Sequence, residues 1–146
     1  MKSIVDIMKL IRSQVYTAKV HNKSVIQDCR LSIADGYDKF LAEITDMSKF
    51  PAVVIVAGHG SYSEGLLNRE PVFGVIVVSK LAGSQEQRTI DALDNFETVA
   101  ALFPGSLGSG TVIDGVTFLP GDFYQAALPD NRAAFVFELR AIQAAD

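Results

Sequence analysis

This chain of 146 residues contains a single cysteine, Cys29, and only two histidines. One cysteine excludes an intramolecular disulfide and a zinc site built from several thiolates. We expect Cys29 to be a small, partly buried residue rather than a reactive thiol. His21 and His59 do not have the spacing of metal ligands, so we interpret each as a surface histidine. The sequence predicts no metal and no cofactor.

The chain also lacks a basic cluster and a long apolar run. Its net charge is −4, and its lysines and arginines are scattered, which argues against a nucleic-acid partner. No apolar stretch reaches the roughly 18 residues of a membrane-spanning helix. Residues 1–6 lack a small-residue cleavage site, so we do not interpret them as a signal peptide. The expected compartment is the cytoplasm.

Hydrophobic residues make up 49% of the chain and charged residues 21%, a composition typical of globular proteins. A chain of this length buries roughly two-thirds of its unfolded surface, so it needs no disulfide or metal for stability. We expect one domain spanning residues 1–146.

Two apolar, β-branched runs at residues 50–57 and 71–78 predict neighbouring strands, joined by a polar, glycine-rich tip at residues 58–70. Residues 111–113 and 116–119 flank Asp114-Gly115, a dipeptide that favours a tight turn. Residues 133–142 predict a terminal strand, whose second half alternates between two faces.

Apolar spacing predicts helices over residues 4–16, 37–44 and 85–103. Ser3 is the expected N-cap of the first helix, and Pro51 limits the second. For residues 24–35 the pattern does not distinguish a short strand from a loop. The order of elements indicates an α+β fold, with a mostly antiparallel sheet of about four or more strands and helices packed on one face.

Residues 61–65 resemble a damaged nucleophile elbow, which suggests a serine hydrolase using Ser61 or Ser63 with His59 or His21. An elbow requires Gly-x-Ser-x-Gly between a strand and a helix. Here Ser61 replaces the first glycine, the next segment is a predicted strand, and no histidine follows His59. A hairpin tip explains the segment more simply.

Other patterns also have simpler explanations. The glycine-rich loop at residues 105–110 follows a helix and precedes a strand, which is the wrong order for a phosphate cradle. Asp91, Asp94 and Glu97 could hold a divalent cation, but a solvated helix face accounts for them. A ligand pocket is an alternative that would use Tyr37, Phe96 and Phe118, although such aromatic residues usually fill a core. Phe118, Phe123 and Tyr124 could form an aromatic platform, yet no basic residues accompany them.

From residue 4 to residue 142, the order of elements resembles small tail proteins of bacteriophages, in particular the Mu-like prophage tail protein family of the tail-terminator or tail-completion type. The resemblance depends on element order, on the strand Phe50-Pro51-Ala52-Val53-Val54-Ile55-Val56 and on the final Phe-Val-Phe-Glu-Leu-Arg strand. Residues 17–35 have no counterpart in that pattern.

The resemblance implies a structural virion protein without enzymatic activity or cofactor. It would form a ring, often a hexamer, with copies of itself and would contact other tail or head-tail joining proteins. Its location would be the host cytoplasm during assembly and then the virion tail. Within the polar tip we expect Tyr62, Leu66 and Leu67 to contact a neighbouring subunit or tail component.

Overall fold

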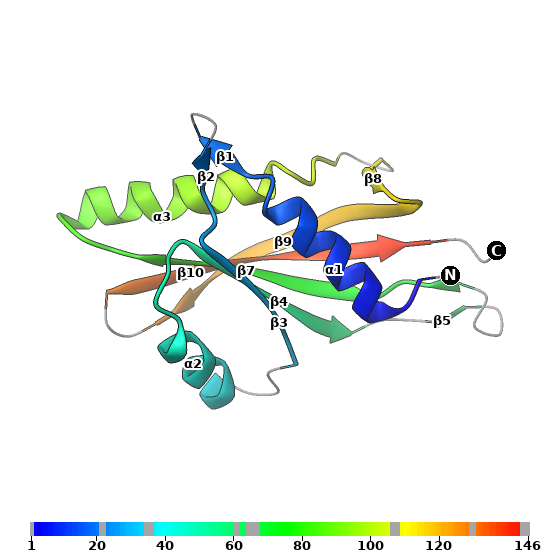
Figure 1. Cartoon of the computed structure of the whole chain (residues 1–146), viewed down its shortest axis with the longest axis horizontal. Helices are drawn as coiled ribbons and strands as arrows, with labels where there is room; N and C mark the ends of the chain where they lie inside the picture. The colour runs from blue at the N-terminus through cyan, green and yellow to red at the C-terminus, as the bar shows by residue number, and fades with distance from the viewer. Residues whose placement is uncertain are drawn as a thin grey trace.

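The computed structural model describes residues 2–20, 23–33, 37–59, 62–63, 68–105, 109–128 and 131–143. Its centre is a curled six-stranded sheet with the strand order β3-β4-β7-β10-β9-β8 (Figure 1). The elements in chain order are α1 (Ile4–Val15), β1 (Lys19–Val20), β2 (Lys23–Ser24), β3 (Asp28–Ser32), α2 (Tyr37–Asp46), β4 (Ala52–His59), β5 (Tyr62–Ser63), β6 (Asn68–Arg69), β7 (Val72–Lys80), α3 (Gln85–Ala100), β8 (Thr111–Ile113), β9 (Val116–Ala127) and β10 (Arg132–Ile142).

The three predicted helices are present with small changes at their ends. The Ser3 side chain accepts a 3.1 Å hydrogen bond from the amide of Asp6 and thereby caps α1 as expected. In the same way, Ser84 accepts a 3.2 Å bond from the amide of Gln87 at the start of α3. The α-helical part of α3 ends at Ala100, and a tighter turn continues to Phe103.

Both predicted strand pairs are confirmed. β4 and β7 are antiparallel, with Ala52 opposite Val78. β8 and β9 are joined at Asp114 and Gly115, which both have positive φ angles. However, β9 extends to Ala127 rather than to residue 119. The register between β9 and β10 shifts between Phe137 and Leu139 of β10, and the two strands remain paired on both sides of this shift.

The sheet is mixed, which corrects the prediction of a mostly antiparallel sheet. β3 runs parallel to β4, with Cys29 opposite Val53. Since α2 lies between these two strands in the chain, it provides the long connection that a parallel pair requires. β10, the last strand in the sequence, lies in the interior of the sheet between β7 and β9.

The prediction that the helices pack on one face of the sheet is wrong, because α2 lies on the face opposite α1 and α3. α1 and α3 bury residues such as Ile11 and Phe96 in one cluster with Val53 and Phe137 of the sheet. Ile44 of α2 instead belongs to a second cluster, which also contains Ala52, Val54, Ile76 and Val136. Successive residues of a strand point to opposite faces, so α2 covers the face opposite α1 and α3.

Candidate functional site

The predicted contact residues lie in the segment between β4 and β7. Tyr62 belongs to β5, where it pairs with Arg69 of β6. Leu66 and Leu67 lie outside the described residues. Their predicted contact with a neighbouring subunit therefore stays a prediction.

The hydrolase alternative gains no support from the structure. Ser61 and His21 lie outside the described residues. Ser63 is the last residue of β5 and His59 is the last residue of β4, but the described side chains include neither of them.

Two of the three aromatic residues of the predicted ligand pocket are core residues, and the side chain of Tyr37 lies outside the described part of the chain. Phe96 and Phe118 are buried in the core, where the Phe118 ring lies 5.8 Å from that of Phe103. Tyr37 belongs to α2, which packs against the other face of the sheet. The aromatic rings fill the interior because a domain of this size needs their volume there.

Cys29 is a buried core residue, which confirms its interpretation as a packing side chain. Burial raises the pKa of the Cys29 thiol to about 12, because the thiolate would lose its hydration. The charge of Arg12 opposes this shift, and that of Asp28 adds to it. The thiol is therefore protonated at neutral pH and is a poor nucleophile.

The acidic residues of α3 do not form a metal site. Asp91, Asp94 and Glu97 are exposed, and Asp91 accepts a 2.8 Å hydrogen bond from the side chain of Gln87. In the described ranges, no group of three or more histidine, cysteine or acidic side chains could hold a metal ion. These residues form a solvated surface of the helix.

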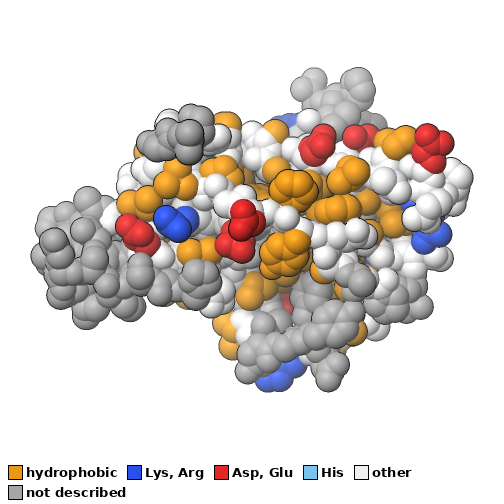
Figure 2. Space-filling view, turned by 180° about the vertical axis from the view of Figure 1, so that it is seen from behind, with side chains coloured by type: hydrophobic (Ala, Val, Ile, Leu, Met, Phe, Trp, Pro, Cys, Tyr) orange, Lys and Arg blue, Asp and Glu red, His pale blue; other side chains and the backbone are white. Residues whose placement is uncertain are grey.

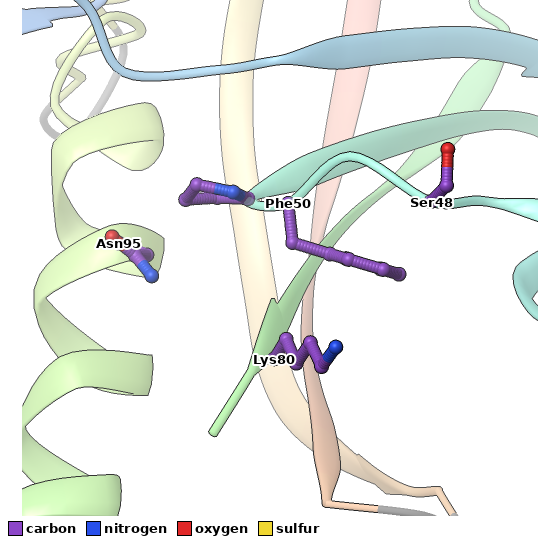
Figure 3. A pocket seen from close by; sticks show the side chains of 5 residues that line it. Ser48, Phe50, Lys80 and Asn95 are labelled. Atoms are coloured by element: carbon purple, nitrogen blue, oxygen red, sulfur yellow. The ribbon is translucent and has the colours of Figure 1, made fainter. Parts of the chain in front are cut away.

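A small open pocket of about 240 Å³ lies where the start of β4, the end of β7 and the middle of α3 approach one another (Figure 3). It is lined by Ser48, Phe50, Pro51, Lys80 and Asn95. The amide nitrogen of Asn95 donates a 2.9 Å hydrogen bond to the buried Ser79 hydroxyl, and the Arg132 guanidinium lies 5.1 Å from the centre of the Phe50 ring. The pocket offers a cation and hydrogen-bonding groups, which suits a small polar molecule. Sequence reasoning missed it because its walls come from three distant segments.

The outer edge of β9 is the second candidate surface. β8 pairs only with residues Val116, Thr117 and Phe118 of β9, so in the described part of the chain residues 121–127 have β10 on one side and no strand on the other. Phe123 and Tyr124 project to opposite faces there and are 65% and 52% exposed. An unpaired strand edge flanked by exposed aromatic side chains is a template for pairing with another chain.

No helix in the described ranges is long and apolar enough to cross a membrane. Neither protein-family models nor curated proteins give a match to this chain.

Proposed function

We propose that this chain is a structural protein of a phage or prophage tail, of the tail-terminator or tail-completion type, which forms a ring with copies of itself. The supporting observation is the unpaired edge of β9 at residues 121–127, with Phe123 and Tyr124 exposed beside it. The resemblance in element order supplies the tail assignment. On this proposal the protein performs no catalysis and needs no cofactor.

The edge of β9 supports an assembly role because natural proteins usually protect such edges. Short strands, prolines or charged side chains commonly block unwanted pairing. Pro120 and Asp122 protect only the start of this edge, and between Phe123 and Ala127 it has no charged residue and no proline. A protein that assembles can keep this surface, since a neighbouring subunit or another tail component covers it.

The proposal is tested by measuring the native mass in solution by light scattering, over a range of protein concentrations and at two salt concentrations. A defined ring, or a monomer that converts to a ring as concentration rises, would support the assembly role. A chain that stays monomeric under all these conditions would contradict ring formation by this protein alone.

The open pocket supports a second candidate function, the binding of a small polar ligand. Lys80 supplies a positive charge at one wall, and Asn95 on α3 supplies an amide (Figure 3). A thermal-shift screen with small anionic metabolites tests this function. A stabilisation that Lys80→Ala abolishes would support it, and an unchanged unfolding temperature throughout the panel would count against it.

A further inference from the structure

One side of α1 combines exposed apolar residues with positive charges. Val5, Lys9, Arg12 and Tyr16 follow each other at intervals of four, three and four residues, which places them in one stripe along the helix and its C-cap. Val5 and Tyr16 are 53% and 42% exposed. We call these four residues the α1 stripe.

The α1 stripe lies beside the β3 edge of the sheet. The Tyr16 hydroxyl accepts a 3.0 Å hydrogen bond from the amide of Cys29 in β3, and the charge of Arg12 acts on the Cys29 thiol. On another side of the helix, the Gln14 side chain donates a 3.2 Å bond to the carbonyl of Leu102, in the turn that follows α3. The stripe therefore faces away from α3.

One side of α3 has residues at the same intervals, with negative charges at the two ends and apolar residues between them. Glu86, Ile90, Leu93 and Glu97 also follow at intervals of four, three and four residues. Both glutamates are exposed, Ile90 is 45% exposed and Leu93 is half-buried. We call these residues the α3 stripe. Figure 2 shows acidic and hydrophobic side chains next to each other along the edge of the molecule where α3 lies.

The α3 stripe lies on the β9 side of its helix. The ring of Phe96 is 5.6 Å from that of Phe123 in β9, whereas the Asn95 side chain is bonded to Ser79 in β7. By helical geometry, Leu93 and Glu97 lie beyond Phe96, on the side away from Asn95. The two stripes consequently flank opposite sides of the sheet, one above β3 and the other above the open edge of β9.

We propose that the partner of the α3 stripe is the α1 stripe of a second copy of this chain, so that copies associate head to tail. This inference rests on the proposed self-assembly and specifies the two surfaces that meet. The opposite charges argue for this partner. Lys9 and Arg12 lie about 4.5 Å apart along α1, whereas Glu86 and Glu97 lie about 16.5 Å apart along α3. Each cation would therefore reach about 6 Å along the interface towards one glutamate of the neighbour. Within the described part of the chain, none of these four residues forms an ion pair.

The charge distribution also selects the symmetry of the contact. A two-fold dimer through the α3 stripe alone would bring α3 against α3, and α3 carries Glu86, Asp91, Asp94 and Glu97 against the single cation Arg88. A two-fold dimer that paired α1 with α3 twice would need both stripes at one contact, but they flank opposite sides of the sheet. Like charges facing each other across an interface oppose association. A contact between two different patches continues from copy to copy and closes into a ring when the rotation permits.

Charge reversal tests the proposal. We expect Glu86→Lys/Glu97→Lys to lower the association constant about tenfold or more, because attraction is replaced by repulsion. Lys9→Glu/Arg12→Glu should produce the same loss. Mixing the two variants, or combining all four substitutions in one chain, should restore association, since the stripes are then complementary again.

The matched control for Glu86→Lys/Glu97→Lys is Asp46→Lys/Asp91→Lys, which raises the net charge by the same amount at exposed positions outside the stripes. It should leave association unchanged, and circular dichroism should show that every variant is folded. An oligomer that persists after charge reversal, or whose loss mixing does not repair, would overturn the head-to-tail contact but leave self-assembly standing. A native chain that never associates would overturn both proposals.

Discussion

The phenolic oxygen of Tyr16 accepts a 3.0 Å hydrogen bond from the backbone amide of Cys29. Tyr16 is the C-cap of α1, and Cys29 lies in β3, at the edge of the sheet. The bond ties the end of the helix to the edge strand. It also gives an edge amide a partner that is not another strand, so β3 is partly protected from pairing.

Replacing Tyr16 with phenylalanine should destabilise the protein by about 1 kcal/mol, because the amide of Cys29 then loses its partner. Urea-induced unfolding measures the free energy of unfolding. Tyr124→Phe is the matched control, since its ring is exposed and the described residues give its hydroxyl no hydrogen-bond partner. Equal effects of the two substitutions would mean that the Tyr16 bond contributes nothing to stability.

The raised pKa of Cys29 predicts a loss of stability at alkaline pH. The unfolded thiol has a pKa near 9.0, and the folded thiol one of about 12, so the unfolded state releases its proton first. Stability from this group is fully present below pH 9 and falls by up to about 1.4 kcal/mol per pH unit between the two values.

Cys29→Ala isolates this effect from the titration of other groups. Below pH 9 the variant should be less stable than the native chain by a constant amount, and the difference should shrink as pH rises further. The measurement is the free energy of unfolding at each pH. A difference that stays constant up to pH 11 would contradict the prediction.

The sequence predicted the elements that have strong local patterns. The apolar residues of α1 recur at helical spacing and are buried as expected, and the β4–β7 hairpin consists of two uninterrupted apolar runs. Because alternate residues of a strand point to the same face, the sequence also predicted Phe135, Phe137 and Leu139 of β10 on one face, and in the structure they pack in one core cluster.

Features that depend on distant segments could not be predicted. β3 alternates polar and apolar residues over only five positions, which is too short to distinguish a strand from a loop, and its place in the main sheet depends on pairing with β4. The open edge of β9 arises because β8 is short, which no pattern within residues 119–127 reveals. The pair Phe123-Tyr124 was the available signal, but with Phe118 it was considered only as an aromatic platform for nucleic acid, which the lack of basic residues argues against.

Gly110 is expected to tolerate no side chain. A Cβ atom at this position would lie 2.3 Å from the carbonyl oxygen of Phe118 and 2.8 Å from a methyl group of Leu119. Gly110→Ala should therefore destabilise the fold by about 2–3 kcal/mol through overpacking. Gly115→Ala is the comparison, because nothing lies within 4 Å of its Cβ and only its φ of +80° is strained, at a cost of about 1 kcal/mol. Thermal unfolding of both variants measures the two losses of stability, and a larger loss for Gly115→Ala than for Gly110→Ala would contradict the prediction.

The pair Leu66 and Leu67 was predicted from the sequence to contact a neighbouring subunit. Leu66→Ser/Leu67→Ser should lower the association constant, because two apolar side chains would be lost from the interface. Light scattering measures the oligomer mass, and the unfolding temperature of the monomer should change little. An unaltered mass at every concentration would show that these leucines are not part of a contact.

Tyr124 gives the most direct test of the β9 edge. Tyr124→Lys places a charge at the centre of the unpaired segment, and charged side chains are a common means of preventing edge pairing. We expect the association constant to fall about tenfold or more, whereas the free energy of unfolding should change by less than about 0.5 kcal/mol, because the site is exposed. Val112→Lys is the matched control, since Val112 is 66% exposed but belongs to β8. If Val112→Lys reduces association as strongly as Tyr124→Lys does, the cause is added charge in general, and the β9 edge is not the surface through which copies meet.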